Sequence, residues 1–175
     1  VPAILAAIAS YCIAGEKTVL SREERTKALI EGNNTFALEL YAKLHTTEGN
    51  LFLSPYSIST ALAMTYSGGR GATAEQMARV LRLPNEPYRT LDSDSRGKLF
   101  YRMEERPISS ENLAAAFGRL QKSLTADPNQ KGHELRIANA LWPQKGFGLK
   151  EEFINLVKTG YGGRLSEVDF FTAPE

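Results

Sequence analysis

The sequence predicts an α+β fold, and three observations support this prediction. Apolar residues recur at helical spacing in three segments, which cover residues 35–44, 111–125 and 149–163. A further helix, over 55–66, has no charged residue on any face from Ile58 onward, which is typical of a helix in a deep core. Alternation over 133–142 and 164–170 predicts two strands. At 175 residues, the chain is long enough for one substantial core.

The N-terminal residues 1–32 are expected to precede the folded domain, which then covers 33–175. Residues 1–14 are apolar and uncharged, and they are too short to span a bilayer. They resemble the apolar part and cleavage region of a secretory signal, and a short buried helix or an apolar extension is the alternative. Residues 16–32 are mostly charged and predict a linker or the frayed start of the next helix. This pattern favours a secreted protein, with cytoplasmic residence as the alternative.

The centre of the chain contains a strand, a helix, a glycine hinge and a second helix in succession. Leu51–Leu53 is expected to be a short buried strand. Ser54 is a suitable N-cap and Pro55 a suitable first helical residue, where its missing N–H costs nothing. The glycines at 68–71 then interrupt the helix, and a capping box at Thr73 is expected to begin the next one.

The segment 84–110 contains three prolines, a glycine and many charges, so we expect an irregular excursion with local order near 98–103. The helix over 111–125 follows, with Arg119 and Lys122 on its outer side. This pair could bind an anionic glycan, although two charges on a helix face are normally only solvated. After the strand over 133–142, Glu151 begins a helix that Gly162 and Gly163 end.

Motifs for catalysis or cofactor binding are absent from the sequence. The net charge of +1 gives no general electrostatic case for nucleic acid or an anionic membrane. A single cysteine, Cys12, excludes an internal disulfide framework and a cysteine-rich zinc site. His45 and His133 have no partner at metal-ligand spacing, and no G-x-S-x-G motif surrounds a serine. The residues therefore indicate a scaffold with no cofactor, no metal and no visible active site; an enzyme that uses either histidine is a minor hypothesis.

Several motifs in sequence order resemble the serpin family. NLFLSPYSISTALAMTYSGGRGATAEQMARVL is similar to the N-terminal signature region of serpins, with its strand, "SPxSI" helix start and "GxxGxT" hinge. TFALELYAKL looks like the first helix of the family, and residues 111–125 look like the fourth. The segment from ELRIANALWPQ to VDF is similar to a strand–helix–strand module of the family. The resemblance covers residues 33–171.

The resemblance implies a serine-type endopeptidase inhibitor. In a serpin, a target serine or cysteine protease cleaves an exposed reactive loop and forms an acyl-enzyme. The loop then inserts as a strand into the large central sheet and traps the protease. Ser54, Pro55 and Ser57 match the region beneath the opening sheet, called the shutter, and Phe52 matches its apolar neighbour. The strands at 133–142 and 164–170 match two members of that sheet.

The expected protein is therefore the N-terminal part of a serpin, with helices against part of a large central sheet. The reactive loop, its hinge, the scissile bond and the C-terminal strands of the family lie beyond the matched residues. A non-inhibitory serpin that acts as a carrier, chaperone or storage protein is the alternative, because the scaffold residues do not distinguish the two.

Overall fold

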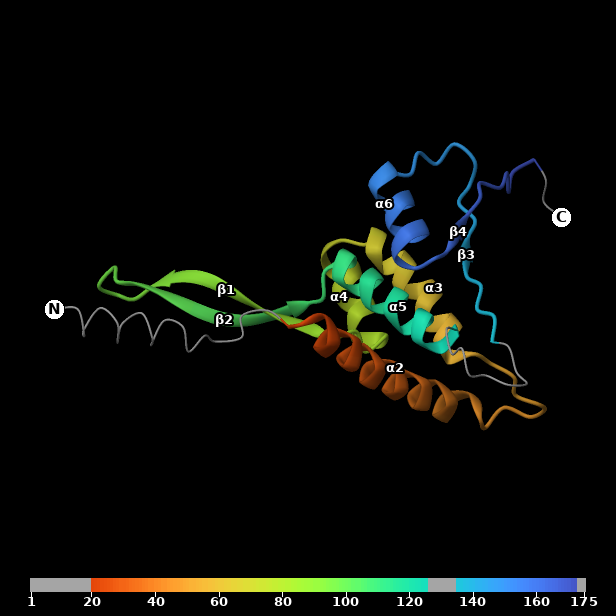
Figure 1. Cartoon of the computed structure of the whole chain (residues 1–175), viewed down its shortest axis with the longest axis horizontal. Coiled ribbons are helices and arrows are strands. Elements are labelled where there is room, and N and C mark those ends of the chain that lie inside the picture. Colours follow the sequence, from red (N-terminus) through yellow and green to blue (C-terminus); the bar gives the residue numbers. More distant parts are fainter. Residues whose placement is uncertain (1–19, 126–134, 173–175) are drawn as a thin grey trace.

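A computed structural model describes residues 20–125 and 135–172 of the chain. Four helices form a cluster: α2 (Arg22–Leu44), α3 (Pro55–Gly68), α4 (Gly71–Val80) and α5 (Ser110–Thr125). A hairpin of β1 (Asn85–Ser93) and β2 (Leu99–Pro107) projects from this cluster (Figure 1). The remaining elements are β3 (Ala140–Leu141), α6 (Glu151–Asn155), the π-helical turn η1 (Leu156–Gly160) and β4 (Arg164–Leu165). The expected mixture of helices and strands is confirmed.

The hydrophobic core lies where α2, α3 and α5 meet, with η1 against α5. Its fully buried residues include Leu29 of α2, Met64 of α3, Phe117 of α5 and Val157 of η1. The helix α3 was expected to be buried on every face, but Leu62 is 41% exposed. Its buried face is formed largely of small and hydroxyl residues, namely Ser59, Thr60, Ala63, Met64, Tyr66 and Ser67. Leu62 and Thr65 are exposed on the opposite side, so the described part of the chain buries α3 mainly on one face.

Helix α2 begins at Arg22, inside the charged segment for which the sequence left open a linker or the start of the next helix. Ser21 and Glu24 form a capping box, in which Glu24 N donates to Ser21 Oγ at 3.1 Å and Ser21 N donates to Glu24 Oε2 at 2.9 Å. Leu29, one turn further, is buried in the core and holds this part of the helix in place. Residues 22–32 are therefore helical despite their many charges, because the capping box fixes the helix start and the buried Leu29 fixes the helix to the core. The boundary expected between 32 and 33 falls inside a continuous helix.

The glycine hinge between α3 and α4 is present, but the capping box expected at Thr73 is wrong. Helix α4 starts at Gly71, with φ of 56°, and its N-cap Arg70 makes no side-chain cap bond. Thr73 therefore lies inside the helix, where its hydroxyl cannot serve as the cap. At the other end of α4, Arg82 has a φ of 55°, and its carbonyl oxygen occupies the space beside Gly32 of α2. A side chain at position 32 would prevent this close approach.

The segment expected to be an irregular excursion is a regular antiparallel hairpin. The two nine-residue strands pair from Asn85 with Pro107 to Ser93 with Leu99. Asp94 closes the turn, because its carboxylate accepts bonds from the backbone N–H groups of Arg96 and Lys98, both at 2.9 Å. Gly97 has a φ of 75°, which favours glycine at that position. The turn chemistry therefore overrides the breaking tendency of the prolines.

The two predicted C-terminal strands form a short parallel ladder. Ala140 pairs with Arg164 and Leu141 pairs with Leu165, and a bridge between Gln144 and Val168 extends the alignment. These strands are much shorter than 133–142 and 164–170, because each has one neighbouring strand among the described residues. The ladder forms only where the two segments run side by side. Residues 133 and 134 of the predicted strand lie outside the described residues.

The predicted strand at Leu51–Leu53 is also wrong. This segment has no strand partner among the described residues, and the side chain of Phe52 is 99% exposed. A strand is stable only with a neighbour that satisfies its backbone groups. The segment instead leads directly into the start of α3.

The helix predicted over 149–163 is confirmed, but its second half is a π-helical turn. Val157 is fully buried, and Phe153 and Leu156 contact the core as expected. Helix α5 and η1 cross at two glycines, where a Cβ on Gly118 would lie 2.5 Å from the carbonyl oxygen of Gly160. This contact brings the backbones of the two helices close together.

Candidate functional site

The start of α3 holds the residues that the sequence singled out. Ser54 is the N-cap, and its Oγ accepts a bond from Ser57 N at 3.4 Å and donates to Ser57 Oγ at 3.1 Å. Pro55 occupies the first helical position, as predicted. Ser54 is exposed and Ser57 half-buried, while Phe52 lies two residues before the cap with its ring in solvent. The structure thus brings Ser54, Pro55 and Ser57 into one capped turn and leaves Phe52 outside it.

From this same turn, an aromatic row connects α3 with α5 and the end of η1. The ring of Tyr56 lies 6.2 Å from that of Phe117, which lies 5.6 Å from that of Tyr161. The hydroxyl of Tyr161 donates to the carbonyl oxygen of Ala63 at 3.1 Å, and it lies 2.9 Å from Ser67 Oγ. Burial raises the pKa of Tyr161 far above its usual value, more than the bond to Ser67 lowers it. Tyr161 is therefore a neutral hydrogen-bonding group at any ordinary pH.

One hydroxyl group on α3, Ser59 Oγ, is buried without a hydrogen-bond partner among the described residues. Beside it, Thr60 Oγ1 donates to the carbonyl oxygen of Tyr56 at 2.7 Å. An unpaired buried hydroxyl costs about 1–3 kcal/mol, so this face of α3 is not at its most stable arrangement. Small hydroxyl residues of this kind can bond to backbone groups and still leave room for a neighbouring strand to move.

The C-terminal half of α3 touches the start of β4. A Cβ on Gly163, the residue before β4, would lie 2.8 Å from Met64 Sδ and 3.2 Å from Val157 Cγ1. From there the ladder continues through Arg164 N to the carbonyl oxygen of Asn139 at 3.0 Å and Ser166 N to that of Leu141 at 3.1 Å. The parallel pair β3–β4 therefore lies close to α3, and a side chain at position 163 would have to displace Met64.

A groove of about 880 Å³ lies between the C-terminal end of α3, the start of α5 and the segment 141–159. Trp142, Phe147 and Phe153 form much of its apolar wall. Two cations line it, Arg70 and Lys150, and Arg70 already donates to the carbonyl oxygens of Ser67 and Gly69. Neither Ser59 Oγ nor Tyr56 OH opens into this groove. Its described polar groups give no indication of a specific ligand.

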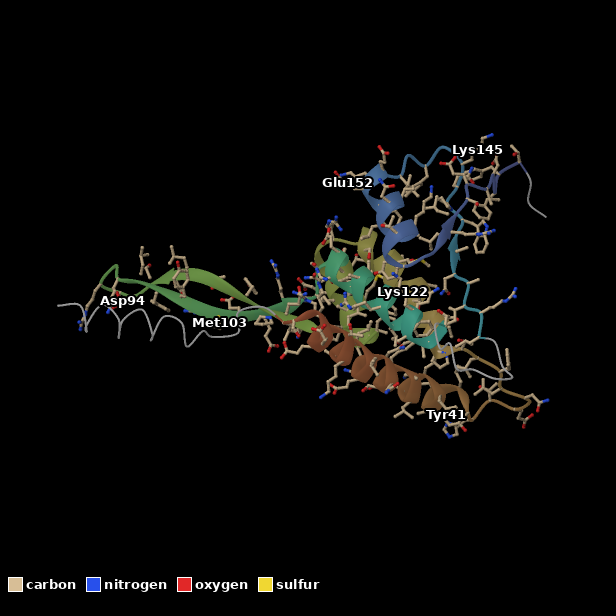
Figure 2. The ribbon with its side chains drawn as sticks, viewed as in Figure 1. Tyr41, Asp94, Met103, Lys122, Lys145 and Glu152 are labelled. Atoms are coloured by element: carbon tan, nitrogen blue, oxygen red, sulfur yellow. The ribbon has the colours of Figure 1, made fainter. Side chains whose placement is uncertain are left out.

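The two cations considered for a glycan do not act together. Arg119 is turned toward α2, where its Nε donates to Thr26 Oγ1 at 2.9 Å and its Nη2 donates to the carbonyl oxygen of Arg22 at 3.1 Å. Burial, together with the charges of Arg22 and Arg25, lowers the pKa of Arg119. Lys122 is exposed on α5, as Figure 2 shows. Arg119 is thus a structural link between α5 and α2.

The histidines show no catalytic arrangement where they are described. His45 lies at the C-terminal end of α2, its Nδ1 is 2.9 Å from the carbonyl oxygen of Ala42, and its ring stacks on Tyr41. His133 lies outside the described residues. Within 20–125 and 135–172, no three acidic, histidine or cysteine side chains gather as metal ligands. No helix in those ranges has the length and apolar character to cross a bilayer.

Known proteins provide the context for this geometry. A model of the family described as Serpin (serine protease inhibitor) matches residues 31–175. The chain belongs to the serpin family. Among similar serpins, an uncharacterised serpin-like protein of Thermococcus kodakarensis is 39% identical over 85% of this chain and 29% of its own length. The leukocyte elastase inhibitor of Bos taurus is 32% identical over 84% of the chain and 32% of its own length.

Solved serpin structures show the same fold. The reaction-loop-cleaved angiotensinogen of lamprey matches with a TM-score of 0.60 and 22% identity, over 86% of this chain and 37% of its own. Arabidopsis AtSerpin1 in its native stressed conformation matches with a TM-score of 0.59 and 19% identity, over 89% of this chain and 33% of its own. The chain spans about a third of the length of these serpins. The serpin-like α+β fold is confirmed.

Sequence reasoning missed Tyr161, Ser67 and Gly163 as members of this site. The sequence contains one partial signal for Tyr161. A large aromatic residue between glycines is unusual at the end of a helix. The two groups on α3 that bond to the Tyr161 hydroxyl are almost a hundred positions away in the chain. Local patterns do not reveal contacts at that separation.

Proposed function

We propose that this chain is the N-terminal part of an inhibitory serpin, which traps a serine protease as a covalent acyl-enzyme. The observation that carries the proposal is the serpin match over residues 31–175, together with an elastase inhibitor among its relatives. The reactive loop would lie C-terminal to these residues. A protease would cleave that loop, and the loop would then join the central sheet as an added strand. In this role the protein is an inhibitor and has no enzymatic activity of its own.

The candidate site would contribute the surface beneath the opening sheet. We assign the shutter role to Ser54, Pro55 and Ser57, with Phe52 as their apolar neighbour. The short β3–β4 pair supports this assignment, because the outer edge of β4 has no strand partner among the described residues and Gly163 already rests on α3. We also propose that residues 33–175 form the N-terminal portion of one serpin domain, to which 22–32 add the first turns of α2.

The test uses the full-length protein that carries this chain, mixed with serine proteases of different specificity such as trypsin, chymotrypsin and elastase. Inhibition by trapping produces a complex that survives denaturing electrophoresis and has the summed mass of protease and cleaved serpin. The same protein with its reactive loop already cleaved is the control, and it should form no complex. Cleavage by every protease without a stable complex would reject the inhibitory proposal and favour a carrier, chaperone or storage serpin.

Export from the cell is a further proposal, and it rests on the apolar, uncharged residues 1–14 alone. The relatives include archaeal proteins and leukocyte elastase inhibitors, so the family match does not decide it. The N-terminal sequence of the protein isolated from culture medium and from cells would test it. A protein that retains residues 1–14 and stays inside the cell would support cytoplasmic residence instead.

A further inference from the structure

The pairing of β3 with β4 continues beyond the two-residue ladder, but it is interrupted once. The paired segments are 139–145 and 164–169, and Arg164 N and Ser166 N donate to carbonyl oxygens of the first segment at 3.0 and 3.1 Å. In a regular parallel ladder, the carbonyl oxygen of Ser166 would next accept a bond from the backbone nitrogen of residue 143. That residue is Pro143, which has no N–H, so the regular ladder stops before it.

Beyond Pro143, the two segments bond to each other again. Val168 N donates to the carbonyl oxygen of Pro143 at 3.0 Å, and Lys145 N donates to that of Val168 at 2.9 Å. Figure 2 shows Lys145 at the end of the pair that lies away from the helical cluster. The interruption leaves this end with these two backbone bonds, so it is the part of the pair that we expect to separate first.

Side chains bond across the same end of the pair. Gln144 Nε2 donates to Asp169 Oδ1 at 3.2 Å, and Gln144 Oε1 accepts a bond from Phe170 N at 2.9 Å. Asp169 Oδ1 also accepts bonds from Phe171 N at 3.1 Å and Thr172 N at 3.3 Å. Hydrogen bonds, that of Thr172 foremost and that of Gln144 next, lower the pKa of Asp169, so its side chain is a carboxylate at neutral pH. These bonds are called the Gln144–Asp169 clasp below.

We propose that Gln144 and Asp169 are positioning residues, which keep β3 and β4 joined as one piece while the rest of the central sheet rearranges to admit the cleaved reactive loop. This proposal rests on the proposed function. The clasp lies beyond Pro143, where the backbone bonds of the pair are fewest. Hydrogen bonds to an ionised carboxylate are about twice as strong as those between neutral groups, so the clasp compensates for the missing bond.

The position of the clasp also fits this role. The described chain leaves the pair at Thr172, and the clasp binds the backbone N–H groups of 170–172. A displacement of the chain that follows therefore reaches β4 through the clasp. A pair that opened between β3 and β4 would offer the loop a second, incorrect strand edge. Delayed insertion would give water time to hydrolyse the acyl-enzyme, which releases the active protease and leaves the serpin cleaved.

Amide hydrogen exchange of the full-length protein tests the clasp itself. Gln144→Leu removes the carboxamide, so the backbone amides of Lys145 and Val168 should exchange about tenfold faster or more. Asp169→Ala should have the same effect, and the double variant should exchange no faster than either single variant, because both side chains belong to one contact. Asp169→Asn keeps an accepting oxygen and should restore most of the protection. Glu167→Ala is the matched control, since Glu167 is exposed on the same segment and lies outside the clasp.

The stoichiometry of protease trapping tests the positioning role. Gln144→Leu and Asp169→Ala should each raise the number of serpin molecules cleaved per trapped protease by about twofold or more, because insertion is slower. Ser21→Ala is the control for a purely structural effect. It removes the capping box of α2 and lowers the unfolding midpoint without touching either strand, so the stoichiometry should stay unchanged.

The outcomes separate this proposal from the proposed function. Unchanged exchange of Lys145 and Val168 in both single variants would overturn it. Faster exchange with an unchanged stoichiometry, or an equal rise with Ser21→Ala, would overturn it as well. If the unmodified protein traps no protease, the proposed function fails by itself, and exchange in the loop-cleaved protein then decides the clasp. Retained protection of Lys145 and Val168 after cleavage would support the clasp, and loss of that protection would reject it.

Discussion

Tyr161 links the end of η1 to α3 through a hydroxyl group that is buried in the core. It donates to the carbonyl oxygen of Ala63, and it shares a hydrogen bond with Ser67 Oγ. Ser67 Oγ itself lies 3.1 Å from the same carbonyl oxygen. The Tyr161 hydroxyl, the Ser67 hydroxyl and the Ala63 carbonyl oxygen therefore each contact the other two. The loss of one hydroxyl changes the hydrogen bonds of both remaining groups.

Tyr161→Phe should lower the free energy of unfolding of the full-length protein by about 1–3 kcal/mol, because it removes the two buried hydrogen bonds of the Tyr161 hydroxyl, each worth about 0.5–1.5 kcal/mol. The midpoint of urea unfolding would measure the change. Tyr41→Phe is the control, since Tyr41 is 55% exposed on α2 and should have little effect. Equal midpoints for the Tyr161 variant and the unmodified protein would contradict this account.

Gly118 is the second residue whose identity the structure explains. In an open helix, Gly→Ala adds stability of about 0.5–1 kcal/mol. Here the new Cβ would lie 2.5 Å from the carbonyl oxygen of Gly160, so α5 and η1 would be forced apart. Gly118→Ala should instead destabilise by about 1–3 kcal/mol.

Thermal unfolding would measure this loss. Gly68→Ala is the matched control, because its Cβ would meet its nearest neighbour, Phe153, at 3.4 Å. Gly68→Ala should leave the melting temperature unchanged or raise it. If Gly118→Ala also raised the melting temperature, α5 and η1 could not cross as closely as described.

At the scale of secondary structure, the sequence predicted best what short-range chemistry determines. The start of α3 follows from Ser54 and Pro55 alone, and both were predicted correctly. The hairpin was missed because its prolines were read as breakers of regular structure. The backbone groups of Pro87 point away from β2, so its missing N–H breaks no hydrogen bond between the two strands. The turn from Asp94 to Gly97, between residues that favour strands, was the overlooked signal.

Strand lengths were the least predictable feature of the elements. Alternation indicated that residues 164–170 can form a strand, but only Arg164 and Leu165 form a regular ladder with β3. The same holds for Leu51–Leu53, which has strand-like composition and no neighbour. A strand is defined by its partner, and a partner distant in sequence leaves no local signal. The shutter role of Ser54, Pro55, Ser57 and Phe52 stays a prediction for the same reason.

Ser54→Phe tests the role of the α3 start. The substitution removes the N-cap oxygen that binds Ser57, a loss of about 1 kcal/mol, and adds a large ring to a site proposed to lie beneath the sheet. In the full-length protein it should lower the thermal midpoint and promote polymerisation, measured by calorimetry and native electrophoresis. Ser54→Asp keeps the cap and serves as the control for the helix start. Unchanged stability and protease trapping in the Ser54→Phe variant would count against the shutter assignment.

For the whole molecule, the described structure leaves much apolar surface uncovered. The exposed side chains include Phe52 at 99%, Phe171 at 84% and Leu38 at 71%. The chain spans about a third of the length of its serpin relatives, so it contains only part of the surface that buries such residues in a serpin. The overall class and order of elements were predictable because several motifs occur in serpin order. The contacts between α3 and the C-terminal elements were not, since they join residues far apart in the chain.

The 175-residue chain expressed alone should therefore be unstable and prone to aggregate, because open strand edges and apolar side chains are available for association. Light scattering and calorimetry of a concentration series would measure this, with the full-length protein as the control. A monomeric chain that melts in one sharp cooperative transition would contradict the prediction.

The groove beside α3 contains a natural optical reporter. Trp142 is the only tryptophan of this chain, it is 60% exposed, and it follows β3 directly in sequence. Its fluorescence should be that of an indole in water, and it should shift to shorter wavelength whenever a chain segment covers the groove. Any rearrangement of the β3–β4 pair could then be timed by stopped-flow mixing, without a label or a substitution.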